Sequence, residues 1–220
     1  KLNEHERIIE RNMQGLSKLV DALDPITVLP FAGSFILGGK LHERNKYLAT
    51  TTWDRCASYL EDNISTQSNV ICLRENNEFD LSSGTLMQQY EPIDENDMDR
   101  YIHSISTETY DYEKDELPDL DQLQKDLKEA SKRMLQRSVN YGIKLNTNIA
   151  LLINDKKVVL IDENSSHVNL ICEVDLRLLR RILDRKAQWN NAEIGCHITF
   201  WREPNIYDPD AHTALQFLHL

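Results

Sequence analysis

The sequence has few residues that interrupt regular secondary structure (glycine and proline) or cross-link a chain (cysteine). It holds 7 glycines, 6 prolines and 4 cysteines among 220 residues, which excludes collagen-like and low-complexity classes. The cysteines are far apart and form no CxxC pair, so the sequence predicts reduced thiols rather than a disulfide framework. No apolar run approaches the ~20 residues that cross a bilayer, and no secretory signal opens the chain. We therefore expect a cytoplasmic protein that makes no membrane contact.

Positive charge is also in short supply. The chain has 25 Lys and Arg against 36 Asp and Glu, a formal net charge of −11. Such a surface repels phosphate backbones, which disfavours nucleic acid as a partner. Hydrophobic residues make up 40% and charged residues 28%, values that are ordinary for globular domains.

Motifs that would identify an active site are missing from the sequence. The seven histidines form no HxH, HxxxH or HExxH spacing, so we predict no metal site in this chain. Phosphate-binding glycine loops and the GxSxG pattern of a nucleophile elbow are also absent. Cys196 and His197 are neighbours on a predicted strand, where their side chains would point to opposite faces rather than form a nucleophile pair. Catalytic residues stay unknown at this level.

The first part of the chain, residues 1–85, begins with an amphipathic helix over residues 2–24. Asp24-Pro25 ends it, because the residue before proline avoids the helical region. A buried strand over residues 26–29, a helix over residues 45–62 and a strand over residues 70–73 follow. Residues 86–118 are rich in carboxylates and predict an acidic linker; a divalent-cation cluster is the alternative, although no calcium-loop spacing is present.

The second part, residues 119–220, predicts an α+β domain. A helix begins after Pro118-Asp119, residues 149–161 read as a β-hairpin, and a third strand and a helix capped by Asp175 follow. A strand over residues 194–201 and a helix over residues 210–218 close the pattern. We expect a β-meander and a further strand in one mainly antiparallel sheet, with helices on one face.

Two segments carry a resemblance to a known family. Residues 23–35 read LDPITVLPFAGSF, and residues 189–195 read WNNAEIG and lead on to REPNIY at residues 202–207. They are similar to the P-x-x-x-x-P-F-A-G and W-(D/N)-x-x-x-I-G … R-x-P-x-x-Y patterns of the metallo-β-lactamase-fold proteins that include CMP-N-acetylneuraminate hydroxylase and its bacterial relatives. A comparable family turn, P-G-x-x-x-D-L, corresponds to residues 74–81, with Glu75-Asn76 in place of proline-glycine.

The resemblance implies that the chain is the C-terminal half of a larger protein; a start at Lys1 inside a helical pattern, without Met, agrees with this. Residues 1–85 would complete the αββα metallo-β-lactamase-like sandwich. The absent N-terminal half would carry the HxHxDH cluster with zinc or iron, and some relatives add a Rieske 2Fe–2S centre. In this fragment we expect no cofactor, since the loop after residues 26–29 lacks the last metal-binding His of lactonase-like members. The order of elements in residues 119–201 also resembles sterol-carrier-protein domains, by analogy only.

The function implied is that of a metal-dependent hydrolase or hydroxylase-like enzyme to which this chain adds scaffold and a cleft for a small-molecule substrate. The alternative is a non-catalytic module that carries an apolar ligand or serves assembly, with the missing N-terminal half, a partner chain or a second copy as partner. Arg202 could anchor an anion, or it could pair with Glu203, Asp208 or Asp210 or stack on Tyr207. The expected substrate-binding residues are Phe31, Ala32, Gly33, Ser34, Trp189, His197, Arg202 and Tyr207.

Overall fold

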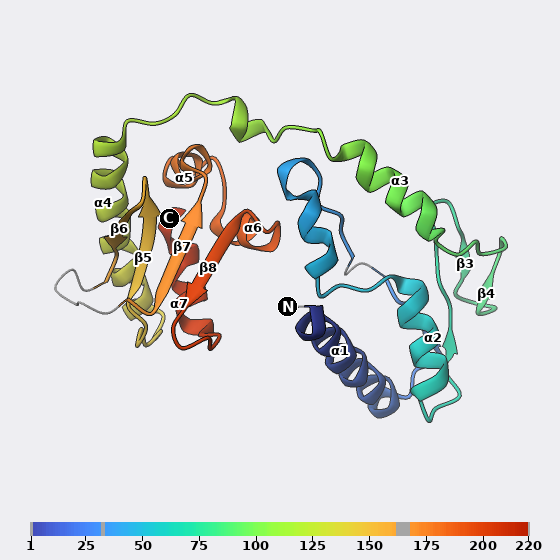
Figure 1. Ribbon diagram of the computed structural model, residues 1–220. Coiled ribbons are helices and arrows are strands. Elements are labelled where there is room, and N and C mark those ends of the chain that lie inside the picture. Colours follow the sequence, from blue (N-terminus) through green and yellow to red (C-terminus); the bar gives the residue numbers. More distant parts are fainter. Residues whose placement is uncertain (1, 32–33, 162–167, 220) are drawn as a thin grey trace. The chain divides into compact units, whose positions relative to one another are not determined.

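The computed structural model describes residues 2–31, 34–161 and 168–219. The chain divides into two compact units, Lys1–Glu108 and Thr109–Leu220, and each is described here by itself (Figure 1). The division falls inside the segment 86–118 that the sequence assigns to a linker. Helices and short strands are mixed throughout, so the fold is α+β.

The helices of the first unit begin with α1 (Leu2–Leu23). It stops where the sequence predicts, because Asp24 takes a left-handed φ of 45° in front of Pro25. The single helix expected over residues 45–62 is wrong: a 3₁₀ helix η1 (Gly39–Tyr47) and α2 (Trp53–Asn63) replace it. Thr52 ends the intervening segment by accepting a hydrogen bond from the amide of Arg55 at 3.2 Å, so α2 has an N-cap of its own.

Strands in the first unit are only two residues long. β1 (Thr27–Val28) pairs in parallel with β2 (Asn69–Val70), and β3 (Phe79–Asp80) pairs antiparallel with β4 (Thr85–Leu86). A small cluster of Val20, Cys56 and Leu60 packs against β1 and β2. The last helix of the unit, α3 (Glu95–Ile105), contacts η1.

The second unit is built on a four-stranded sheet in the order β6-β5-β7-β8. Its strands are β5 (Ile149–Ile153), β6 (Lys156–Val159), β7 (Leu170–Val174) and β8 (Ile198–Arg202). The predicted hairpin is present, with Asn154 and Asp155 at positive φ in its turn. The predicted meander is wrong. β7 does not pair with β6, the strand before it in the chain, but lies on the other side of β5 and pairs with β5 in parallel. β8 then pairs antiparallel with β7.

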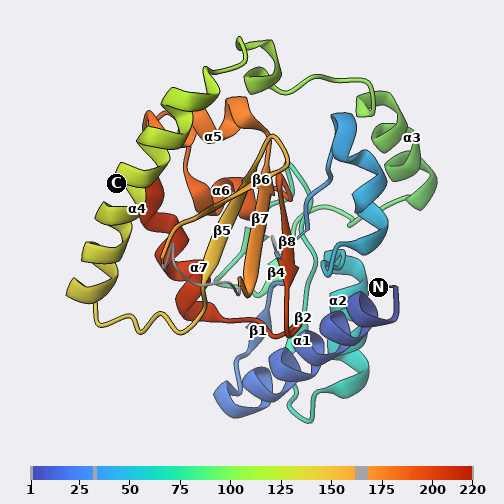
Figure 2. The same ribbon diagram turned by 60° about the vertical axis from the view of Figure 1, so that its left-hand side comes forward.

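Helices cover one face of this sheet. Figure 2 shows α4 (Leu120–Asn140) and α7 (Pro209–Leu215) on the same side of the strands. Alternate strand residues point at them, and Leu151, Cys172 and Phe200 are neighbours across β5, β7 and β8 on that face. α5 (Leu176–Leu183), α6 (Trp189–Ile194) and the 3₁₀ helix η3 (Gln216–His219) complete the layer. The core lies between the two layers.

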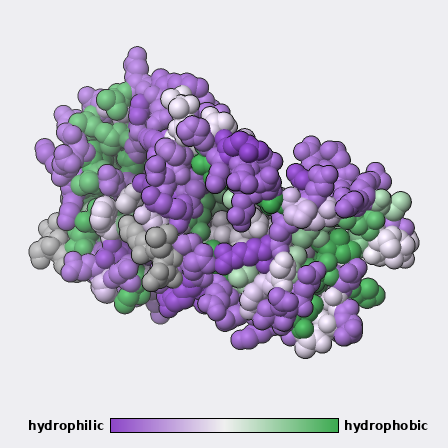
Figure 3. All heavy atoms as spheres, turned by 45° about the vertical axis from the view of Figure 1, so that its right-hand side comes forward, coloured by the Kyte–Doolittle hydropathy of each residue, from purple (hydrophilic) through white to green (hydrophobic). Residues whose placement is uncertain are grey.

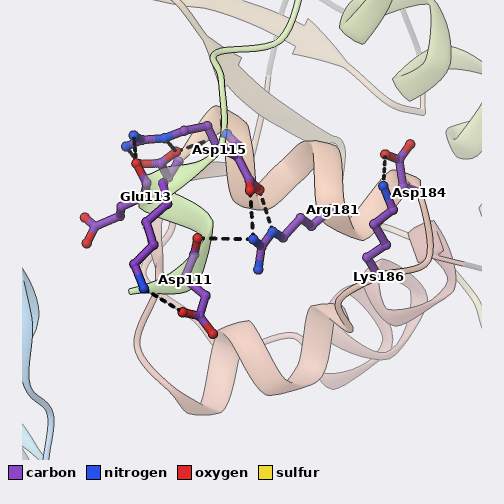
Figure 4. Close-up of polar contacts among 9 residues, drawn as sticks. Asp111, Glu113, Asp115, Arg181, Asp184 and Lys186 are labelled. Atoms are coloured by element: carbon purple, nitrogen blue, oxygen red, sulfur yellow. Dashed lines mark hydrogen bonds and ion pairs between the residues drawn. The ribbon is translucent and has the colours of Figure 1, made fainter. Parts of the chain in front are cut away.

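The start of the second unit is held against α5. Tyr112, in the 3₁₀ helix η2 (Asp111–Lys114), is buried in the core. Figure 4 shows Arg181 of α5 bonded to Asp115 and to the backbone of Asp111. Arg177 of the same helix donates to the carbonyl oxygen of Glu113 at 2.7 Å. Residues 111–115, which the sequence places in a linker, are therefore ordered by contacts to α5.

The surface is mostly hydrophilic on the face drawn in Figure 3, with apolar side chains in several places. The helices formed by the described ranges include none with the length and apolar character needed to span a membrane.

Candidate functional site

A cavity of about 360 Å³ lies in the second unit, at the end of β8. One wall comes from the segments that precede and begin β5 and β7, and the other from the loop after β8 and the start of α7. Its lining consists of Asn146, Thr147, Asn169, Leu170, Arg202, Glu203, Pro204, Ile206, Tyr207, Asp208, Pro209 and His212. The volume lies in the range of small-molecule sites. We call it the Arg202 cavity.

Arg202 is the last residue of β8 and sits opposite Leu170 in the register with β7. Its guanidinium carbon lies 6.0 Å from the centre of the Tyr207 ring. Among the described residues no carboxylate forms an ion pair with it, and its buried Nε has no hydrogen-bond partner. Of the alternatives that the sequence left open, stacking on Tyr207 is observed and pairing with a neighbouring acid is not.

Asn169 fixes the loop that carries the far wall of the cavity. Its carbonyl oxygen accepts from the amide of Glu203 at 2.9 Å, and its Nδ2 donates to the carbonyl oxygen of Glu203 at 3.2 Å. Its Oδ1 in turn accepts from the amide of Asn148 at 3.2 Å. The loop is thereby tied to the segments before β5 and β7, and the Glu203-Pro204 bond within it is cis.

Asp208 caps α7 and is fully engaged by its neighbours. Its Oδ1 accepts from the amides of Asp210 and Ala211 at 3.0 and 3.2 Å, and its Oδ2 accepts from the hydroxyl of Thr147. Burial alone would raise the pKa of Asp208, but the hydrogen bonds from Thr147 and from the two amides outweigh it and lower the pKa. Asp208 is therefore an ionised carboxylate, and both of its oxygens accept hydrogen bonds from donors of its own chain.

His212 on α7 is the buried titratable group of the cavity, with 5% of its surface exposed. Its Nδ1 lies 2.5 Å from Oε1 of Glu193 on α6. The Phe200 and Tyr207 rings lie 4.7 and 4.6 Å from the imidazole, centre to centre. Nε2 of His212 is buried and has no hydrogen-bond partner in the described part of the chain. A carboxylate at one ring nitrogen with the other left open is an arrangement suited to proton transfer or to ligand binding.

Two expected residues from the second sequence segment lie in the Arg202 cavity, and two do not. Arg202 and Tyr207 line it. Trp189 is fully buried in the core and lines none of the cavities described here, so its role is packing. His197 instead contacts two tyrosines, with Nδ1 3.1 Å from the Tyr112 hydroxyl and its ring 4.6 Å from that of Tyr110.

The strand expected over residues 194–201 is wrong at its start. Residues 189–194 form α6, Cys196 takes a left-handed φ of 58°, and β8 begins only at Ile198. Cys196 and His197 thus precede the strand, and the expectation that strand alternation separates them does not apply.

The expected residues near the start of the chain lie in the first unit. Phe31 is 84% exposed and borders an apolar cavity of about 370 Å³ between α1 and α2. Ser34 borders a separate, larger cavity of about 1070 Å³, together with residues of η1 and α3. Ala32 and Gly33 lie outside the described residues.

A metal-binding group is not found among the described residues: none of their His, Cys, Asp and Glu side chains gather in threes or more as ligands. Sequence reasoning missed His212, Glu193 and the capping role of Asp208. One sequence signal for a buried histidine was available: His212 falls on the apolar face of the helix expected over residues 210–218, together with Ala211, Leu215 and Leu218. All four residues are buried in the structure.

Comparison of the chain with protein-family models, with curated proteins and with solved structures gives no match.

Proposed function

We propose that this chain is the C-terminal portion of a larger cytoplasmic enzyme with the metallo-β-lactamase fold, a metal-dependent hydrolase or hydroxylase-like protein. The chain contributes scaffold and a substrate cavity rather than the main metal ligands. The observation that carries the proposal is where the second resembling segment lies: Arg202, Glu203, Pro204 and Tyr207 all line one cavity. The last part of the second resembling segment thus lines a cavity of small-molecule size.

Arg202 is the anchor for substrate in this proposal. A guanidinium presents a planar set of donors that matches a carboxylate or phosphate group. Among the described residues no carboxylate forms an ion pair with Arg202. The Tyr207 ring lies against the guanidinium, and this contact orients the side chain without neutralising its charge. A negatively charged small molecule is the substrate that this chemistry favours.

The first unit supports the idea of a larger sandwich. Of the largest fully buried side chains in the described ranges, only Leu60 belongs to it. Leu23, Ile26 and Phe31 are 69%, 89% and 84% exposed, which leaves apolar surface on either side of β1. A two-residue parallel strand pair is a small fragment of sheet, since parallel sheets are normally covered on both faces. In the proposal an N-terminal half with HxHxDH ligands would complete this unit, and zinc or iron held by those ligands would supply the chemistry that activates water.

The test uses the longer protein. The coding sequence upstream of Lys1 should encode an HxHxDH motif, and the purified longer protein should contain stoichiometric zinc or iron, with a 2Fe–2S centre where a Rieske module is present. Arg202→Ala in that protein should raise KM by about tenfold or more with little change in kcat, whereas Arg133→Ala, an exposed position on α4, should change neither. A natural start near Lys1, or unchanged kinetics for Arg202→Ala, would count against the proposal.

The second candidate is a non-catalytic binding module, and the completeness of the second unit favours it. The Arg202 cavity and a continuous core both lie within residues 109–220. The charged lining of the cavity argues against an apolar ligand of the sterol-carrier kind. Native mass spectrometry of the 220-residue chain would reveal a retained apolar ligand, and light scattering would show self-association through the exposed side chains of residues 19–31.

A further inference from the structure

The proposed function uses Arg202 and leaves the most deeply buried titratable side chain of the cavity without a role. His212 is 5% exposed and lies between the Phe200 and Tyr207 rings. Glu193 engages Nδ1 at 2.5 Å, while Nε2 is buried with no partner in the described part of the chain. A buried polar atom that lacks a partner costs free energy, so a group that supplies the partner would be stabilised there.

Two buried nitrogens of the cavity lining, Nε of Arg202 and Nε2 of His212, have no hydrogen-bond partner in the described part of the chain, while Glu203, which also lines the cavity, is exposed. Asp208 is occupied by Thr147 and by the amides at the start of α7, and Glu193 is occupied by His212. The guanidinium of Arg202 has no acid partner among the described residues, and Nε2 of His212 has none either. Both side chains line the same cavity. A ligand group that accepts hydrogen bonds and carries negative charge satisfies both.

We propose that the Arg202 cavity holds the carboxylate or phosphate group of a small molecule between the Arg202 guanidinium and Nε2 of His212, and that Glu193 fixes His212 for this contact. The proposal deepens the proposed function and rests on it, because it takes the cavity to be the substrate-binding site. Glu193 and His212 are added to it as binding and positioning residues. The shared chemistry of the ligand is an oxyanion within the reach of two donors.

The contact at Nδ1 determines what Nε2 can do. With Nδ1 directed to Glu193, the imidazolium form of His212 also carries a hydrogen on Nε2 and donates it to an oxyanion. The charged groups around the imidazole are Glu193 from α6 and Asp208 at the start of α7, with Arg202, Glu203 and the Tyr207 phenol in the same cavity.

The test is calorimetry on the 220-residue chain with inorganic phosphate and, separately, acetate as probes. Each titration is run at pH 7.5. The expected result is binding of at least one probe. Preference for phosphate or for acetate then tells which oxyanion the cavity favours.

Variants separate the two donors. Arg202→Gln should weaken binding by about tenfold or more. His212→Gln and Glu193→Gln should weaken it by about threefold to tenfold. His103→Gln and Arg133→Gln, at exposed positions on α3 and α4, are the matched controls and should bind as the unaltered chain does. If His212→Gln lowers stability too far, the ¹⁵N signal of Nε2 in the unaltered chain should still shift on addition of the probe.

The outcomes distinguish this proposal from the proposed function. Loss of binding in Arg202→Gln, with unchanged affinity in His212→Gln, overturns the role of His212 and leaves the Arg202 site standing. Absence of binding for both probes overturns the oxyanion site altogether. Neither result touches the metal content of the longer protein, which tests the enzyme assignment separately.

Discussion

Arg181 and Asp115 are joined by two hydrogen bonds. Nε of Arg181 donates to Oδ2 of Asp115 at 2.5 Å, and Nη2 donates to Oδ1 at 2.8 Å (Figure 4). Nη2 also donates to the carbonyl oxygen of Asp111 at 3.1 Å. One guanidinium on α5 therefore holds both ends of η2, the first element of the second unit, against α5.

Asp115→Asn should make the second unit less stable at neutral pH and should leave its acid stability unchanged. The hydrogen bond from Arg181 lowers the pKa of Asp115 and outweighs desolvation, which alone would raise it. Stability from this carboxylate is thus present above its unfolded pKa of about 3.9 and is lost as pH falls through the lower folded value. Urea midpoints of the two proteins should differ at pH 7 and converge near pH 2. Glu116→Gln, exposed in the same segment, should match the unaltered chain at both values; a difference that persists at low pH would contradict the assignment.

Trp189→Phe should lower the free energy of unfolding by about 1–3 kcal/mol, because it shortens a fully buried side chain in the core. Its indole Nε1 has no hydrogen-bond partner in the described part of the chain, so no bond is lost with it. Urea unfolding followed by far-UV circular dichroism measures the change. Trp201→Phe is the matched control: Trp201 is 58% exposed and should cost less than about 0.5 kcal/mol. Equal losses for both variants would argue against a packing role for Trp189.

Tyr90→Phe should destabilise the start of α2 by about 1 kcal/mol. The Tyr90 hydroxyl accepts from Nε1 of Trp53 at 2.6 Å and donates to Oδ1 of Asp54 at 2.7 Å. Amide hydrogen exchange over residues 53–60 should accelerate in the variant and stay unchanged in Tyr101→Phe, whose ring is 57% exposed.

Burial, together with the hydrogen bond to Asp54, also raises the pKa of Tyr90. The folded first unit keeps this phenol protonated, so its contribution to stability is complete below about pH 10 and is lost as the pH rises through the folded value. Alkaline titration of tyrosinate absorbance should show one phenol fewer in the high-pH fraction for Tyr90→Phe. An unchanged curve would contradict the pairing.

Asp155→Gly should raise the free energy of unfolding by about 0.5–1 kcal/mol. Asn154 and Asp155 form the hairpin turn with φ values of 47° and 62°, a region where glycine is not strained. Asp155→Val, the opposing control, should destabilise, because a β-branched side chain resists positive φ. Thermal unfolding of both variants measures the effect. A lower melting temperature for Asp155→Gly than for the unaltered chain would show that the Asp155 side chain has another role.

Local signals predicted much of the fold. Asp24-Pro25 marks the end of α1, and Asp175 caps α5 by accepting from the amide of Arg177 at 3.0 Å. Asn154-Asp155 marks the hairpin. Each of these effects depends on neighbours within a few positions, so the sequence contains what is needed to predict it.

Long-range relationships were not predicted. The parallel pairing of β5 with β7 depends on where the chain returns after β6, and alternation of apolar residues is the same for either direction. The sequence predicts no element over residues 189–193 and a strand from residue 194, yet residues 189–194 form a helix with Trp189 and Ala192 buried. Burial of these two side chains depends on tertiary packing, which local propensity does not report.

The candidate site shows the same division. Arg202 and Tyr207 were predicted from a contiguous segment, and both lie in the cavity. His212 and Glu193 are 19 residues apart on different helices, and no short spacing motif links them. Only the packing of α6 against the C-terminal helices shows that they meet.

The hydrogen bond between Thr147 and Asp208 spans 61 residues of chain. During synthesis the first wall of the Arg202 cavity leaves the ribosome long before the second, so the cavity closes only after nearly the whole second unit has emerged. The ligand proposed above would therefore find its site only after residue 208 has been synthesised. Binding of that ligand would stabilise the folded second unit by mass action and would slow its proteolysis.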